Sequence, residues 1–171
     1  MTPAIVERTL FDFSTVPGDD GWQILNDGVM GGVSSSRFER IRGLAVFQGT
    51  VSLDNNGGFA SVRSPLIPPR LSGCDTFVLR VRGDGHRYKF TVRMQSSFDR
   101  AIYQSVFAPA PAAWEELRLP FADFVPTFRG RTLTGEPPLD SAGIVSVGFL
   151  ISEKQAGPFR LEIAWIQAVG R

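Results

Sequence analysis

The sequence predicts an all-β protein built as a sandwich or a barrel, and two observations carry this prediction. Hydrophobic residues alternate with polar residues at a period of two along most of the 171 residues. Glycine, proline, asparagine and aspartate separate these runs, and each of them favours turns. With 43% hydrophobic and 20% charged residues, the chain has the composition of a globular protein with a sizeable core. We therefore expect one β-sandwich domain over residues 1–171.

The expected strands follow from this alternation, which is clearest where Tyr88, Phe90, Val92 and Met94 alternate with polar residues. In chain order, strands are expected at 8–13, 22–26, 33–39, 44–53, 59–64, 76–82, 86–95, 101–107, 113–119, 144–152 and 158–168. Short helical turns are expected at 120–124, where Pro120 suits a helix start, and at 140–142. The stretch 126–138 is expected to be an irregular surface loop.

The net charge, the apolar stretches, the cysteine count and the first residues of the chain limit the classes of function and the compartment that we expect. The net charge is +1 and no Lys/Arg-rich run is present, so nucleic acid is not an expected partner. No apolar stretch is long enough for membrane insertion. One cysteine, Cys74, rules out an intrachain disulfide and fits a reducing compartment. Because residues 1–8 resemble neither a secretory signal nor a mitochondrial targeting segment, we expect a cytoplasmic protein.

The first of two glycine-rich stretches spans residues 26–34. Gly28, Gly31 and Gly32 are predicted to be structural, at positions that need a positive φ or a close approach of chains. A strand pattern follows rather than a helix, so a phosphate-binding loop is not expected.

Asn26 and Asp27, at the start of this stretch, allow two interpretations. Their side chains could bond nearby backbone amides and fix the turn, which we favour. They could instead line a small polar pocket beside Trp22 and Met30.

The second glycine-rich stretch spans residues 55–64. A hairpin turn is predicted at residues 54–58, with Gly57 and Gly58 as structural glycines. It resembles a Ca²⁺ loop only faintly, since the terminal bidentate glutamate is missing. Shortly after it, Arg63 could bind a carboxylate or phosphate. It could equally form an internal ion pair with Asp27 or Glu39.

Catalytic, metal-binding and cofactor-binding residues are not expected in this chain. The single histidine, His86, follows a glycine-rich turn and is predicted to be exposed. With one histidine and one cysteine, a zinc site of the usual kinds cannot be assembled. No serine lies in a nucleophile-elbow pattern.

Several motifs occur together in an order that resembles one known family. Trp22 precedes the stretch 26–34, and Tyr88 follows the Gly83-Asp84-Gly85 motif. The remaining matching segments are 47–53, 57–63, 114–124 and 157–163. Over residues 9–168 the chain resembles the complex I intermediate-associated protein 30 family.

This resemblance implies a galactose-binding-like jelly roll and a non-catalytic, chaperone-like role in the assembly of respiratory complex I. The implied partners are proteins, namely complex I subunits or assembly intermediates. The alternative is a carbohydrate- or small-ligand-binding module, for which Trp22, Tyr103 and Trp114 are possible stacking platforms. An enzyme is a third possibility and needs a pocket with a perturbed carboxylate or histidine.

For a ligand or partner, we expect the binding surface to be a concave sheet face or the loops at its rim. Arg93 and Gln95 share one strand face by spacing, whereas Tyr103 and Gln104 point to opposite faces. The candidate binding residues are Trp22, Asn26, Asp27, Met30, Arg63, Arg93, Gln95 and Tyr103.

Overall fold

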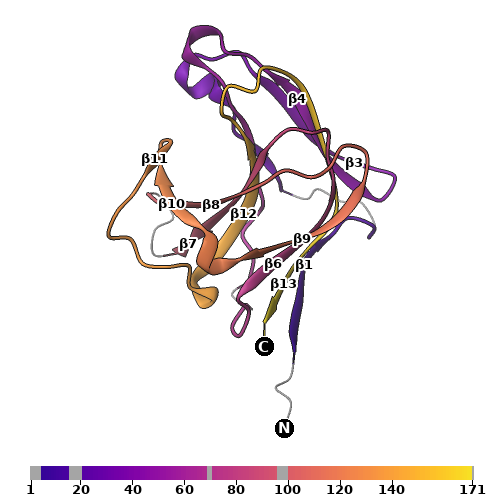
Figure 1. Cartoon of the computed structure of the whole chain (residues 1–171), viewed down its shortest axis with the longest axis vertical. Helices are drawn as coiled ribbons and strands as arrows, with labels where there is room; N and C mark the ends of the chain where they lie inside the picture. Colours follow the sequence, from indigo (N-terminus) through magenta and orange to yellow (C-terminus); the bar gives the residue numbers. More distant parts are fainter. Residues whose placement is uncertain (1–4, 16–20, 69–70, 96–99, 171) are drawn as a thin grey trace.

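Two antiparallel sheets pack face to face around one hydrophobic core (Figure 1). The computed structural model describes residues 5–15, 21–68, 71–95 and 100–170, and of residues 29 and 30 it describes the backbone alone. The helical elements in these ranges are short 3₁₀ turns. They are η1 (Asp27–Met30), η2 (Asp54–Asn56), η4 (Phe121–Asp123) and η5 (Ser141–Gly143).

Sheet A is organised around one long strand. Its strands are β1 (Val6–Asp12), β3 (Ser35–Ile41), β4 (Leu44–Val51), β6 (Thr76–Arg82), β9 (Trp114–Pro120) and β13 (Gly157–Gly170). The order is β3-β4-β13-β6-β9, and β1 pairs with the far half of β13. The yellow β13 therefore lies beside β4, β6 and β1 in turn (Figure 1).

Sheet B contains the other described strands in the order β11-β10-β8-β7-β12-β5-β2. They are β2 (Gln23–Ile24), β5 (Ala60–Arg63), β7 (Tyr88–Met94), β8 (Ile102–Phe107), β10 (Val125–Phe128), β11 (Arg131–Thr132) and β12 (Ile144–Ile151). The side chains of its central strands β7 and β12 that face the core are uncharged, as packing against a second sheet requires.

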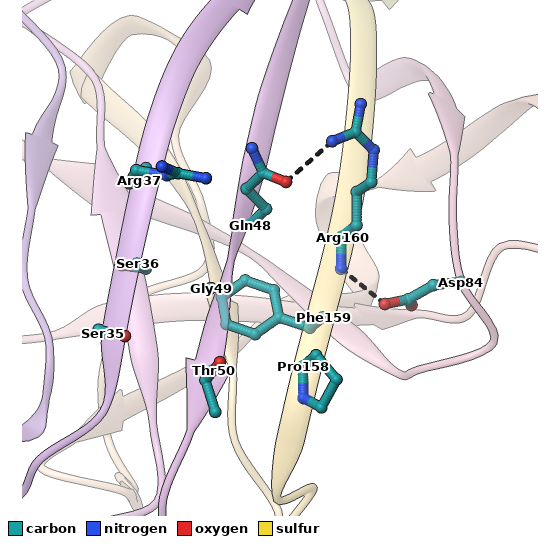
Figure 2. A pocket seen from close by; sticks show the side chains of 10 residues that line it. All are labelled: Ser35, Ser36, Arg37, Gln48, Gly49, Thr50, Asp84, Pro158, Phe159 and Arg160. Carbon is teal, nitrogen blue, oxygen red and sulfur yellow. Dashed lines mark hydrogen bonds between the residues drawn. The ribbon is translucent and has the colours of Figure 1, made fainter.

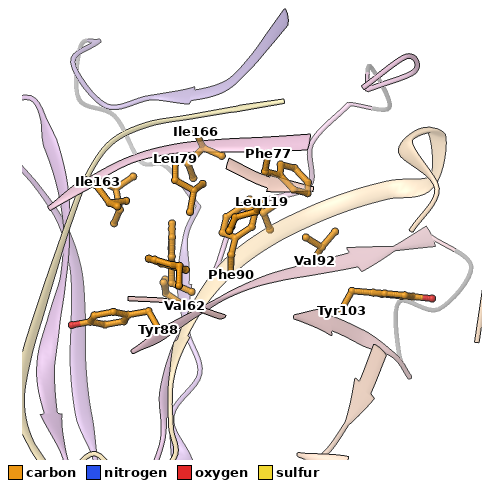
Figure 3. Close-up of a cluster of buried hydrophobic side chains, with 14 of the residues drawn as sticks. Val62, Phe77, Leu79, Tyr88, Phe90, Val92, Tyr103, Leu119, Ile163 and Ile166 are labelled. Atoms are coloured by element: carbon orange, nitrogen blue, oxygen red, sulfur yellow. The ribbon is translucent and has the colours of Figure 1, made fainter. Parts of the chain in front are cut away.

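The core consists of the inward rows of both sheets (Figure 3). Phe77 of β6 meets Phe90 of β7 edge-on across the sandwich, with ring centroids 5.0 Å apart. Leu79 and Val92 on the same two strands are fully buried. Burying each such side chain contributes about 1.5–3 kcal/mol, so these alternating rows supply most of the stability.

The predicted fold class is confirmed, and each of the eleven expected strands is present, β6 with the expected ends and the others with shifted ends. The helical turns expected after Pro120 and near residue 140 are η4 and η5. The expectation of an irregular loop over 126–138 is wrong in part, because most of β10 and the whole of β11 lie within it. Pro126 and the shortness of both strands hide them from a pattern of alternation.

The expected hairpin at residues 54–58 is also wrong. The strands on either side belong to different sheets, since β4 pairs in sheet A and β5 in sheet B. The connection therefore crosses from one layer to the other. Turn residues indicate where a chain changes direction, but not which strand it pairs with afterwards.

Candidate functional site

Asp27 joins the two glycine-rich stretches through its buried carboxylate. Oδ1 accepts a hydrogen bond from the Ser34 amide at 3.0 Å. Oδ2 accepts from the Ser34 hydroxyl at 2.6 Å and from the amides of Gly58 and Phe59 at 2.8 and 3.4 Å. We call Asp27, Ser34, Gly58 and Phe59 the Asp27 cluster. It fastens the loop after η1 to the segment that enters β5.

The Asp27 cluster keeps its carboxylate charged. Burial alone would raise the pKa of Asp27, but the four hydrogen bonds from Ser34, Gly58 and Phe59 outweigh burial and hold the pKa below its usual range. No cation is needed to balance the charge, because backbone amides aimed at a carboxylate stabilise it. The guanidinium of Arg63 instead donates to Oε1 of Gln23 at 3.2 Å.

The predicted structural glycines fall into three groups, namely those with a positive φ, those packed closely against Asp27, and one with neither property. Gly31 ends η1 in the left-handed region, with a φ of +85°. A Cβ at Gly32 would lie 2.4 Å from Cγ of Asp27, and one at Gly57 would lie 2.5 Å from its Oδ2. Gly58 has a φ of +141°. The prediction for Gly28 is wrong, because its φ is not positive and a Cβ there would meet nothing within 4 Å.

Alanine at Gly32 is expected to lower the free energy of unfolding by about 2–3 kcal/mol, since the anchored Asp27 side chain cannot move aside. Alanine at Gly28 is the matched control in the same loop and is expected to change stability by no more than about 0.5 kcal/mol. Urea unfolding of both variants checks this. Equal effects at the two positions would contradict the role given to Asp27.

Asn26 links the two sheets next to the Asp27 cluster. Its Oδ1 accepts from the hydroxyl of Ser36 on β3 at 2.8 Å and from the amide of Ser61 on β5 at 3.3 Å. Asn26 and Asp27 thus both hold segments together, as the favoured interpretation of the sequence has it. The carboxylate of Asp27 is fully buried, which leaves it no surface for a ligand.

Two aromatic candidates pack against or within the core, Trp22 partly buried and Tyr103 fully buried. The ring of Trp22 stacks on Phe38 with centroids 4.4 Å apart and packs against Phe11 and Phe13. Tyr103 is 1% exposed, and its hydroxyl donates to the carbonyl of Pro137. As a contact residue Tyr103 is wrong, because its ring completes the core, whereas Trp22 is only partly buried and stays a prediction. The side chain of Met30 lies outside the described part of the structure.

Arg63 and Arg93 share the face of sheet B that is turned away from the core. Burial alternates along β5 and β7, which places both arginines on that face. Arg63 lies level with Gly148 of β12, and Arg93 lies level with Ser146 of the same strand. The small residues of β12 therefore separate the two arginines. The other residues of this outer face include Gln23, Thr91, Gln104, Val106 and Val125.

Gln95 and Trp114 complete the predicted set. Gln95 is exposed directly after the end of β7. Trp114 is half-buried on β9, where the guanidinium carbons of Arg80 and Arg82 lie 5.5 and 5.0 Å from its ring centroid. Two arginines over this indole occupy the surface on which a sugar ring would stack.

Asp84 is a second carboxylate centre, and no role for it was predicted from the sequence. It accepts hydrogen bonds from the amide of Arg160 at 2.7 Å, the amide of His86 at 3.1 Å and the hydroxyl of Tyr88 at 2.9 Å. Burial would raise the pKa of Asp84, but these bonds outweigh burial and lower it. The prediction of an exposed His86 is wrong, since its half-buried ring lies with Nδ1 2.9 Å from Oδ2 of Asp84. Of the contacts that Asp84 makes, only the one to the backbone of His86, two residues further along the chain, could have been predicted from the sequence.

Beside Asp84, a cavity of about 590 Å³ opens on the outer face of sheet A, over β3, β4 and β13 (Figure 2). Within the described ranges, no group of three or more His, Cys, Asp and Glu side chains converges as metal ligands. No helix there is long and apolar enough to cross a membrane. Cys74 is buried, and burial raises the pKa of its thiol.

The fold is that of carbohydrate-binding modules. The family 11 module of Clostridium thermocellum, solved with a β-1,3-1,4-mixed-linked tetrasaccharide, superposes with a TM-score of 0.73 over 98% of both chains at 17% identity. A family 29 module superposes with a TM-score of 0.55 over 97% of this chain and 92% of its own at 11% identity. At such identities the likeness shows the fold alone, a jelly-roll β-sandwich.

Sequence comparison identifies the family. The model of the complex I intermediate-associated protein 30 family matches residues 11–163, so the chain belongs to this family. The mitochondrial complex I intermediate-associated protein 30 of Mus musculus is 28% identical, with 93% of this chain and 55% of the mouse protein covered. Its Drosophila melanogaster counterpart is 26% identical, with 92% and 61% covered. The chain thus spans only a little more than half the length of each of these relatives.

The expectation of a cytoplasmic protein is overturned by these relatives, which are named as mitochondrial proteins. It rested on the character of the first residues. Because the chain spans only part of the relatives' length, its first residues do not report the compartment.

Proposed function

We propose that the chain acts as one β-sandwich domain, and as a non-catalytic binding factor in the assembly of respiratory complex I. The observation that carries this proposal is the family match over residues 11–163, together with relatives named after intermediates of complex I. The partners would be complex I subunits or assembly intermediates.

The outer face of sheet B is the surface best suited to a protein partner. It carries Arg63 and Arg93 on the two strands that flank β12. Val106 and Val125, which are 52% and 43% exposed, add apolar area to the same face. Arginine beside exposed apolar side chains is the composition that protein interfaces favour.

The carbohydrate-binding alternative has the fold in its favour but lacks its platforms. Trp22 is packed against Phe38, Tyr103 is buried, and Trp114 is covered by arginines. Each of the three rings expected to stack on a sugar is therefore already in contact with other side chains of the protein. A glycan array with reproducible hits would restore this alternative.

The double substitution Arg63→Ala/Arg93→Ala is expected to reduce the recovery of complex I components in a tagged pull-down about tenfold or more, because arginines at an interface centre contribute about 2 kcal/mol or more. Mass spectrometry after cross-linking measures the recovery. The matched control is Arg118→Ala, an exposed arginine on β9 of the other sheet.

Undiminished recovery by a double variant that keeps its melting temperature would show that sheet B is not the binding face. Recovery of no complex I component by the unsubstituted protein would count against the assembly role itself.

A further inference from the structure

We infer that the cavity on the outer face of sheet A binds a small polyanion, through carboxylate or phosphate groups. This site lies in the other sheet from the proposed partner surface and does not depend on it. Its centre is a row of three polar side chains at one level of three adjacent strands, namely Arg37 of β3, Gln48 of β4 and Arg160 of β13. Adjacent strands are about 4.8 Å apart, so the row offers donors across about 10 Å.

The contacts within the row direct its donors towards the cavity. The guanidinium of Arg160 donates through one terminal nitrogen to Oε1 of Gln48 at 2.8 Å (Figure 2). This bond fixes the orientation of the Gln48 amide, whose NH₂ group is then directed away from Arg160. On the other side, Figure 2 shows the guanidinium of Arg37 reaching towards Gln48. The amide and the guanidinium of Arg37 together form a surface of N–H donors.

The acceptors around the cavity are already used by the protein. Asp84 receives hydrogen bonds from Arg160, His86 and Tyr88. Glu162, next along β13, receives two from the guanidinium of Arg160 and one from Arg82. What the cavity still offers is therefore mostly donors, and the hydroxyl groups of Ser35 and Thr50 add two more.

Charge favours an anion as well. The cavity is lined by two arginines and one aspartate, and because Arg160 is already paired with Glu162, Arg37 is the cation that a ligand would meet. The side chain of Arg37 is 66% exposed, and its nearest carboxylate, that of Glu39, is 4.0 Å away. Such a long, exposed ion pair contributes little and yields readily to a ligand that binds the guanidinium in bidentate fashion.

A neutral sugar fits this site poorly. The aromatic residue among its lining side chains, Phe159, is 3% exposed and packs into the core against Phe47 and Tyr88. The cavity consequently has no ring on which a sugar could stack. Its width of three strands suits a ligand with more than one acidic group.

Titration of the ¹⁵N-labelled protein with citrate and with pyrophosphate tests the inference, with the side-chain amide of Gln48 as the reporter. We expect saturable shifts of this amide with at least one probe, and the stronger probe identifies carboxylate or phosphate as the preferred group. Arg37→Gln should weaken binding about tenfold or more, since a hydrogen bond to a charged group contributes about 1.5–3 kcal/mol. Arg118→Gln removes the same charge from β9 outside the cavity and should leave affinity within about twofold.

A second variant, Gln48→Glu, keeps the acceptor for Arg160 but replaces the donor with a negative charge, and should abolish binding in a folded protein. Linear, unsaturable shifts with both probes would overturn the inference, as would equal weakening by Arg37→Gln and Arg118→Gln. Saturable binding of a neutral mixed-linked tetrasaccharide with no response to either anion would also overturn it, in favour of a carbohydrate site.

Discussion

Replacing Asp27 by alanine is expected to lower the free energy of unfolding by about 3–5 kcal/mol, a large part of the stability of a domain of this size. The substitution removes four acceptor contacts at once and leaves the amides of Ser34, Gly58 and Phe59 without their partner. It also leaves a void against which Gly32 and Gly57 are packed. Urea unfolding at neutral pH measures the change through the midpoint, provided that the m-value is unaltered.

Two further substitutions show whether the loss belongs to the Asp27 cluster. Asp27→Asn preserves the volume but turns an NH₂ group towards amide donors, so it should still cost about 2 kcal/mol or more. Asp54→Asn removes an exposed acid from the adjacent turn η2 and should be nearly neutral. If Asp27→Ala were as mild as Asp54→Asn, the cluster would not be what fastens the two glycine-rich stretches.

Replacing Asp84 by alanine is expected to cost about 2–4 kcal/mol. Its carboxylate connects the segment between β6 and β7 to the beginning of β13, through the amide of Arg160. It also satisfies the hydroxyl of Tyr88, a fully buried side chain of the core. Asp123→Ala, an exposed acid at the end of η4, is a suitable control and should change the midpoint little.

The two carboxylates also give stability a defined dependence on pH. Hydrogen bonds hold the pKa of both Asp27 and Asp84 below the value of an unfolded chain, against the opposing effect of burial. Their contribution is therefore complete above pH of about 4, the unfolded value, and is lost as the pH falls through the lower, folded values. Asp84→Asn should flatten the acid limb of a plot of unfolding free energy against pH. An acid limb of unchanged steepness would contradict the lowered pKa of Asp84.

The layers of this fold were predictable from its sequence because alternation is a local property. Phe77, Phe90 and Phe149 each lie in a run of period two, and each is buried at the centre of the sandwich. The turn at residues 54–58 was equally visible, but its role as a connection between sheets depends on pairing with β12 and β2, which are distant in the sequence.

The candidate site was less predictable, because its contacts join residues that are distant in the sequence. The sequence indicated that Asn26 and Asp27 bond backbone groups, since short polar side chains before glycines often do so. It could not indicate that Gly58 and Ser61 supply those groups, because they lie about thirty residues away. The row of Arg37, Gln48 and Arg160 is assembled from three strands and has no local motif at all.

The position of β13 has a consequence for synthesis on the ribosome. This strand supplies the partner of β1, β4 and β6 within sheet A, yet it is made after all the others. The edges of β1, β4 and β6 that pair with β13 therefore stay unpaired until residues 157–170 have left the exit tunnel. At about 5–20 residues per second, synthesis up to that point takes many seconds. A growing chain of this kind is a natural client for chaperones that shield unpaired strands during translation.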